Sequence, residues 1–322
     1  MAERPAGSHG PAVAEGERAS PATVEAPADP LRPVGGPTQA AGSLSGRGEV
    51  VVRRPGVQET DPRRYKIRRR RIEIALGITV PVLLLVAWEV ASKTGSLDQR
   101  FFPAPSDLWS TGVHLYANGQ MEDNLRKSFA RVFEGFFLGS AAGLLFGIGL
   151  GSARTVRAAL EPLVYALWTI PKLALLPLLL LFFGLGELPV VLLIAIECMF
   201  LVLIPTVTAI VAVPEAYREA AASFGASPRQ MLRYVTLPAA LPQMFVALRL
   251  AAGASVLVMV AAEYVDGKQG VGFFIFNSWQ LFATKQMYVG IVTVAVAGAI
   301  WTLIVTAVGR AVTRWERAGR AA

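Results

Sequence analysis

The stretch REAAASFGASPRQMLRYVTLP, residues 218–238, is a polar island with three arginines in an otherwise apolar chain. It has the composition of two short helices joined at a glycine. Pro214 and Glu215 favour the start of the first helix, which runs through a series of alanines to Phe224. Gly225 then ends this helix, because glycine enters the left-handed C-cap conformation without strain.

A second helix is predicted to follow at once. Ser227 can cap it, Pro228 fits its first position, and Gln230, three residues after the cap, completes a capping box. We expect this helix to reach about Val235 and to stop before the segment LPAALP at 237–242.

The two helices would form a compact elbow, and we use this name for residues 214–238. Its alanines leave a low surface that another backbone can approach closely. A solvated loop between two apolar segments is the plainer alternative, but two successive capped helices favour a protein-docking element. The residues that remain to meet acidic partners are Arg218, Arg229 and Arg233.

The chain as a whole is membrane-like, with 53% hydrophobic and 17% charged residues and a mean hydropathy of +0.48. Such a composition is too apolar for an ordinary soluble domain. Six apolar runs approach the roughly 20 residues that cross the bilayer as a helix. The sequence therefore predicts an all-α polytopic protein with a six-helix domain over 72–310, whose spans are 72–92, 132–151, 159–183, 188–213, 243–262 and 286–309.

The basic residues predict the orientation of these spans. If the cluster RRYKIRRRR at 63–71 lies in the cytoplasm, the segments on that side carry sixteen basic residues and those on the other side six. This bias places both termini in the cytoplasm, with the loop 214–242 and the basic end 311–322. The cluster adjoins a span, which disfavours a nucleic-acid partner.

Residues 1–62 are rich in proline, glycine and alanine and lack apolar periodicity, so we expect a disordered cytoplasmic tail. No apolar segment typical of a signal peptide follows the start. The sequence contains no GxxxxGK[ST] loop, so the chain itself is not expected to bind ATP or any other cofactor. One cysteine, Cys198, and two histidines offer no metal site, and no catalytic group cluster indicates an enzyme.

The third predicted span is interrupted by Pro162, Pro171 and Pro177. Each proline removes an amide donor and exposes a carbonyl four residues back. Broken helices occur at membrane depth where protein or a water-filled cavity satisfies the backbone. A substrate pathway and a bend needed only for packing both fit this pattern.

Lys172 follows the second of these prolines, and a lysine at mid-membrane costs about 2.5 to 3.5 kcal/mol on insertion scales. It could meet an anionic substrate, pair with carbonyls that the prolines free, or reach the interface if the span begins later. Glu197 in the fourth span is a similar candidate. The candidate pathway-lining residues are Pro171, Lys172, Pro177 and Glu197.

Three further expectations concern polar residues near the span ends. Arg131 and Glu134, three apart on one helix face, suggest a local ion pair. Ser106 can cap a short helix that starts at Asp107, in a segment outside the cytoplasm. The segment EYVDGKQGVGFF, 263–274, is also expected outside, where its glycines permit tight turns.

The elbow resembles the EAA loop of permease subunits of bacterial ATP-binding cassette (ABC) importers. Gly225 stands six residues after Glu219, and Val235 ten residues after Gly225. The family usually has isoleucine where this chain has Val235. The residues that the resemblance places at the ATPase contact are Glu219, Ala220, Ala221, Gly225, Leu237 and Pro238.

Other stretches resemble one branch, the permeases of nitrate, sulfonate and taurine importers. They are FFPAPSDLW at 101, IPKLALLPLLLLFFGLGE at 170 and FGASPRQMLRYVTLPAALP at 224. The resemblance covers about residues 70–315 and leaves the proline-rich tail outside.

The resemblance implies a type I ABC importer permease in the bacterial inner membrane. Its partners would be a second permease subunit, as a homodimer, a cytoplasmic ATPase dimer that binds the ATP, and an extracytoplasmic substrate-binding protein. The substrate would be a small anion such as a sulfonate, taurine or nitrate. A self-contained transporter or channel driven by an ion gradient is the alternative, but such proteins often pair broken helices in two halves, and only one broken span is conspicuous here.

Overall fold

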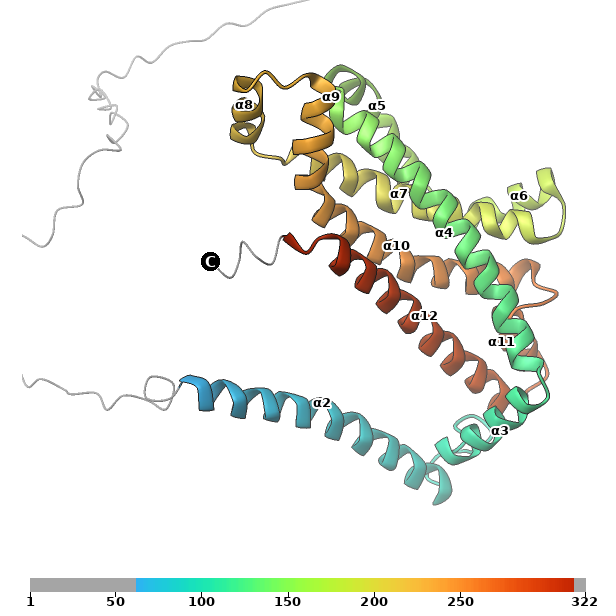
Figure 1. Ribbon diagram of the computed structural model, residues 1–322. Helices are drawn as coiled ribbons and strands as arrows, with labels where there is room; N and C mark the ends of the chain where they lie inside the picture. Colours follow the sequence, from blue (N-terminus) through green and yellow to red (C-terminus); the bar gives the residue numbers. More distant parts are fainter. Residues whose placement is uncertain (1–61, 316–322) are drawn as a thin grey trace, which may run out of the picture. The chain divides into compact units, whose positions relative to one another are not determined.

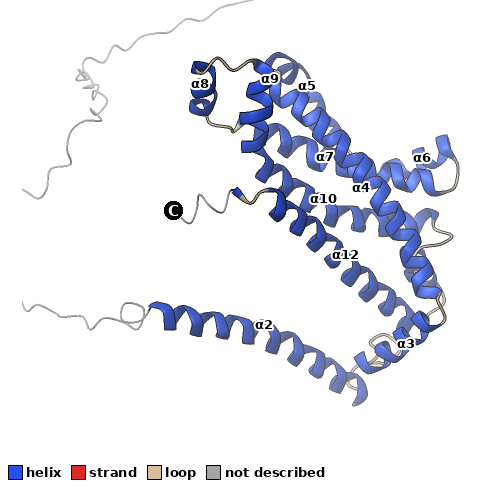
Figure 2. Ribbon diagram, in the orientation of Figure 1, coloured by secondary structure: helices blue, strands red, loops and turns tan. Residues whose placement is uncertain are grey.

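The computed structural model describes residues 62–315, and these residues are helical with no strand among them (Figure 2). The all-α class is confirmed, while the tail predicted for 1–62 lies outside the described residues except for Pro62. Residues 66–315 belong to one compact unit. Its main helices are α2 (Pro62–Lys93), α3 (Pro105–Ala117), α4 (Gln120–Ser152), α5 (Arg154–Trp168), α6 (Leu176–Phe183), α7 (Glu187–Val211), α8 (Glu215–Ser223), α10 (Leu237–Asp266), α11 (Val271–Gln280) and α12 (Thr284–Val312).

Five of the predicted spans are helices long and apolar enough to cross a membrane, with bounds at Ile67–Lys93, Gln120–Ser152, Glu187–Val211, Pro228–Val265 and Thr284–Val312. The remaining one is the bent pair Arg154–Trp168 and Lys172–Phe183, whose halves meet at 83°. The prediction of six spans therefore holds if this pair counts as one. The basic segment 63–71 is the helical start of α2.

Only one of the three prolines in the third span marks its break. Pro162 lies inside α5 without ending it, and Pro177 occupies the first turn of α6, where its missing amide costs nothing. Pro171 has extended backbone (φ −63°, ψ 107°) and separates α5 from a 3₁₀ turn, η1 (Lys172–Leu175). The bend thus arises where an extended residue replaces a helical one.

The tightest packing in the structure joins α4 to α7. Glycines recur every fourth residue along α4, and an added Cβ would lie 2.6 Å from the Ile194 Cβ at Gly135 and 2.7 Å from the Thr206 Cβ at Gly147. Small residues at this spacing let two helix backbones approach closely, as in membrane helix pairs. We call this contact the glycine seam; its members are Gly135, Gly139, Gly143, Gly147 and Gly151.

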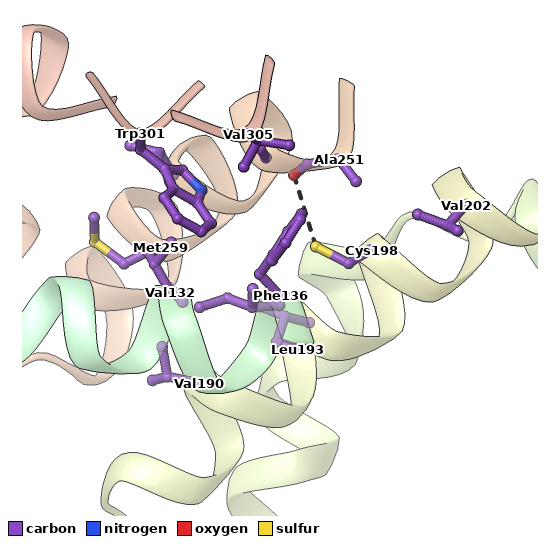
Figure 3. Close-up of a cluster of buried hydrophobic side chains, with 14 of the residues drawn as sticks. Val132, Phe136, Val190, Leu193, Cys198, Val202, Ala251, Met259, Trp301 and Val305 are labelled. Carbon is purple, nitrogen blue, oxygen red and sulfur yellow. Dashed lines mark hydrogen bonds between the residues drawn. The ribbon is translucent and has the colours of Figure 1, made fainter. Parts of the chain in front are cut away.

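Beside the glycine seam lies the main hydrophobic core, to which α4, α7, α10 and α12 contribute (Figure 3). The Trp301 ring of α12 meets Phe136 edge-on at 5.2 Å between centroids. Cys198 is buried there, and its thiol donates a hydrogen bond to the Ala251 carbonyl at 3.7 Å. Cys198 is therefore a packing residue that shares its surroundings with aliphatic side chains.

Helix α2 contacts the rest of the unit near its C-terminal end, beside α3 (Figure 1). The expected role of Ser106 as a helix cap is wrong: α3 begins at Pro105, after Ala104. Ser106 instead donates from its backbone N and its Oγ to the Glu89 carboxylate of α2, at 2.9 and 2.7 Å. Proline at the first position starts the helix, which frees the Ser106 hydroxyl for this bond between helices.

Candidate functional site

The first half of the elbow is helix α8, in which no residue is buried. Gly225 follows it with φ +78°, as predicted for a glycine terminator. The Gly225 N–H donates to the Ala222 carbonyl at 2.9 Å and the Ala226 N–H to the Ala221 carbonyl at 3.1 Å. This pair of bonds is a Schellman motif, which satisfies carbonyls that the helix end would leave unpaired.

The second half of the elbow begins with the predicted capping box. The Ser227 N–H donates to the Gln230 Oε1 at 2.8 Å, and the Gln230 N–H donates to the Ser227 Oγ at 3.4 Å. The predicted end of this helix near Val235 is wrong. The short α9 (Pro228–Gln230) leads through a π-helical stretch, η2 (Met231–Thr236), directly into α10.

The continuity has a local cause. Pro238 lies in the first turn of α10, where an ordinary α-helix would lose a hydrogen bond and meet the proline ring. The wider π-helical winding comes immediately before it, and such bulges accommodate an interruption without ending a helix. Leu237 packs against a buried cluster to which Ala209 and Ile210 of α7 and Met244 of α10 belong. The elbow is therefore built as an extension of a membrane-spanning helix.

The elbow presents an open surface at one end of the bundle, where α8 stands beyond the ends of α4 and α7 (Figure 1). Glu219, Ala220 and Gly225 are exposed, and Ala221 is half-buried. Phe224 is 91% exposed, a feature that the sequence analysis missed although its place at the end of a polar helix could have indicated it. Exposed aromatic side chains are frequent anchors of protein interfaces.

Two of the three arginines of the elbow have partners within the chain: the Arg233 guanidinium lies 5.7 Å from the Tyr234 ring centroid, and Arg218 binds a backbone carbonyl. Arg218 donates from Nη2 to the Ile210 carbonyl at 2.7 Å, so the expectation that it remains for an acidic partner is wrong. The bond satisfies a carbonyl near the C-terminus of α7, where a cation also complements the helix dipole. Arg229 and Arg233 are exposed.

The candidate pathway residues lie around the break in the third span. Lys172 donates a hydrogen bond to the Trp168 carbonyl, and its Nζ lies 5.8 Å from the Trp168 ring and 5.5 Å from the Phe200 ring of α7. Pro171 precedes it at the break, and Pro177 begins α6. Glu197 is half-buried on α7, and the described residues show no ion pair between it and Lys172. Lys172 thus pairs with a carbonyl near the break, one of the possibilities that its position allowed.

The expected pair of Arg131 with Glu134 is wrong, because Arg131 lies between two other carboxylates. It forms ion pairs with Glu187 at the start of α7 and, at 2.5 Å, with Glu263 near the end of α10. A partner on another helix lets the guanidinium lie inside the bundle, whereas Glu134 is exposed. Burial of both partners favours a hydrogen-bonded pair over a free charge.

Glu263, the first residue of the segment 263–274, is completely buried. Its carboxylate accepts from the Ser128 hydroxyl at 2.8 and 2.9 Å and from the Gly272 N–H at 2.8 Å. Gly270, at φ +120°, makes the turn into α11, where an added Cβ would lie 2.5 Å from the Glu263 carboxylate. Glu263 therefore fixes the start of α11 against α4 and α10.

Comparison with known proteins agrees with this architecture. Residues 139–317 match the family model described as binding-protein-dependent transport system inner membrane component. The aliphatic sulfonates transport permease protein SsuC of Bacillus subtilis is 31% identical, over 86% of this chain and 97% of its own. The taurine transport system permease protein TauC of Escherichia coli is 31% identical over 77% and 91%, and the nitrate import permease protein NrtB of Leptolyngbya laminosa is 27% identical over 74% and 87%.

A solved structure shares the fold. It is a bacterial ABC transporter involved in the import of the acidic polysaccharide alginate, and one of its chains aligns with a TM-score of 0.53 at 17% identity. The alignment covers 80% of the present chain and 98% of that chain. The overall fold of the present chain is therefore similar to that of a chain of this transporter.

Proposed function

This chain belongs to the family of binding-protein-dependent transport system inner membrane components, and we propose that it is the permease of an ATP-driven importer of small anions. The observation that carries the proposal is the elbow: an exposed, doubly capped helical pair continuous with a membrane-spanning helix. Such a rigid extension suits the transmission of a movement from a partner outside the membrane to the helices inside it.

We assign the elbow to contact with the ATPase. Glu219, Ala220 and Ala221 supply a polar group and small side chains on α8, and Gly225 sets the direction of the following helix. Phe224 joins this set as an exposed apolar anchor. Leu237 and Pro238 hold the elbow in place at the start of α10.

The complete importer would contain two copies of this chain, an ATPase dimer on the cytoplasmic side and a substrate-binding protein on the opposite side of the bacterial inner membrane. ATP would bind to the ATPases alone, and this chain would require no cofactor. In this arrangement each ATPase would meet one elbow.

The proposed cargo is a sulfonate, taurine or nitrate, the solutes after which the relatives are named. The environment of Lys172 supports the proposal that the cargo is an anion. The Lys172 ammonium group interacts with a carbonyl and with aromatic faces, and no ion pair with a carboxylate is found for it in the described part of the chain. A positive charge solvated in this way remains available to an anion on the pathway.

The decisive experiment is uptake of labelled taurine and nitrate into proteoliposomes that contain this chain, its ATPase and its binding protein. We expect uptake that requires ATP and the binding protein. The chain alone, tested with proton and sodium gradients, should take up nothing; gradient-driven uptake there would instead establish the self-contained transporter. An elbow variant, Glu219→Lys, should reduce uptake and recovery of the ATPase in pull-down together.

A further inference from the structure

Arg131 has two carboxylate partners of opposite character. Glu263 is fully buried and holds three kinds of donor at once: the guanidinium, the Ser128 hydroxyl and the Gly272 N–H. The Glu187 side chain is 62% exposed, although the arginine that it contacts is 8% exposed. The inner partner is therefore a fixed part of the fold, whereas the outer one can be exchanged for another group at little cost in buried contacts.

The donors of the guanidinium divide in the same way. Nη1 donates to the Glu263 carboxylate at 2.5 Å and to the Gln269 carbonyl at 3.0 Å. Nε and Nη2 form the outer fork and donate to the two oxygens of Glu187, at 2.7 Å for Nη2. Such a planar fork binds two oxygens of a carboxylate, and a sulfonate or nitrate presents two oxygens in a similar way.

The fork opens onto a cavity of about 220 Å³ between α4, the start of α7 and the turn before α11. This volume is several times the ~30 Å³ that one water occupies in the liquid, which leaves room for a small oxyanion. Lys268 and Gln269 line the cavity, and the Lys127 ammonium donates to the Gln269 side chain at 2.5 Å. A lysine that lines the cavity and a lysine bound to the Gln269 side chain thus contribute positive charge to this region.

The chain before Glu187 is suited to reorientation of the carboxylate. Gly184 and Gly186 have φ values of +76° and +152°, which glycine alone adopts without strain. Glu187 is also the first residue of α7, so a change of its side-chain rotamer leaves the helix ladder unaffected. When the carboxylate leaves, the Arg131–Glu263 pair is neutral and the nearby lysines balance the charge of an incoming anion.

We propose that the outer fork of Arg131 is a binding site for a small oxyanion of the sulfonate or nitrate class, which Glu187 occupies when no anion is bound. The inference rests on the proposed function, because the anion would be the transported solute. Arg131 then serves as a specificity-determining residue: the fork favours two coplanar oxygens, and the carboxylate competes with weakly bound anions.

The test uses the purified full-length chain and methanesulfonate, with the affinity taken from the concentration dependence of its thermal stabilisation. Glu187→Gln should increase the apparent affinity for methanesulfonate about tenfold. The Glu187 carboxylate leaves the fork free in only a fraction of the molecules, and the apparent affinity is reduced by that fraction. Arg131→Lys keeps a positive charge beside Glu263 but loses the fork. Its apparent affinity for methanesulfonate should be about tenfold lower or weaker still. Glu134→Gln removes an exposed carboxylate three residues along the same helix and should change nothing.

An unchanged or lower affinity in Glu187→Gln would overturn the proposal, even if Arg131→Lys fails to fold. Repeating the titration in nanodiscs of phosphatidylcholine and of phosphatidylglycerol distinguishes a free solute from a lipid phosphate, because competition by phosphatidylglycerol would assign the fork to a headgroup. ATP-dependent uptake by the unmodified complex tests the proposed function separately. If the unmodified complex shows normal uptake and Glu187→Gln binds methanesulfonate no better, the anion site at Arg131 is refuted and the proposed transport function stands.

Discussion

Gly225 sets the angle between the two halves of the elbow through its backbone alone. An added Cβ would meet nothing within 4 Å, so a larger side chain there is opposed only by the left-handed φ of +78°. The cost for a residue with a Cβ is about 1 to 2 kcal/mol, and it is highest for β-branched residues. A substitution at this position therefore perturbs direction without disturbing packing.

We expect Gly225→Val to misdirect the second half of the elbow and to reduce ATPase recovery and solute uptake together. Gly95 provides a matched control, because it has the same φ of +78° and the same open surroundings. Gly95→Val should cost similar stability in a thermal melt yet leave ATPase binding intact. Wild-type pull-down and uptake by Gly225→Val would remove the elbow from the coupling route.

Lys172 allows a test of the anion pathway at the same scale. Its ammonium group interacts with the Trp168 carbonyl and the Phe200 ring, and Lys172→Gln retains a donor for the carbonyl while removing the charge. We expect uptake of taurine to fall several-fold, with assembly and basal ATP hydrolysis unchanged. Lys285→Gln, which breaks a surface pair with Asp107, is the control. Normal uptake by Lys172→Gln would leave it a local stabiliser of the helix break.

At the scale of elements, the glycine seam between α4 and α7 leaves little room for any larger side chain. At Gly147 an added Cβ would lie 2.7 Å from the Thr206 Cβ and 2.9 Å from the Leu203 carbonyl, and backbone atoms cannot move aside easily. Gly147→Ala should therefore destabilise the protein by about 1 to 3 kcal/mol, measured as a lower midpoint of thermal unfolding. Gly149→Ala, two residues away with nothing within 4 Å, should be neutral or slightly stabilising. Equal melting curves for the two variants would contradict the seam.

The elements also show which features could be read from the sequence. The capping box at Ser227 and the terminator at Gly225 were predictable because each depends on residues a few positions apart. The Arg131–Glu263 contact joins residues 132 positions apart, and a single sequence carries no signal for such a pair. The glycine repeat of α4 was visible in the sequence and was missed. The prediction that the helix ends near Val235, before Pro238, is wrong, because the π-helical winding before Pro238 lets the helix continue.

For the whole molecule, the orientation in the membrane is the main prediction. The native Cys198 is buried, so introduced cysteines can be labelled selectively. A membrane-impermeant maleimide should label Arg100→Cys in intact cells and Arg229→Cys only after permeabilisation, because the basic residues bias the elbow toward the cytoplasm. The unmodified chain is the control for Cys198. Labelling of Arg229→Cys in intact cells would reverse the topology.

The helix that begins in the elbow runs without interruption over Pro228–Val265, and Glu263 lies near its far end. At 1.5 Å per residue these positions are about 50 Å apart, the depth of a whole membrane. This helix thus connects the proposed ATPase contact at one end to the proposed Arg131 anion site at the other. A rotation or axial shift imposed at Pro228 would pass through η2 and along α10 to the Glu263–Arg131 pair. Anion binding at Arg131 and the movement of the ATPase would then both act on the position of this one helix.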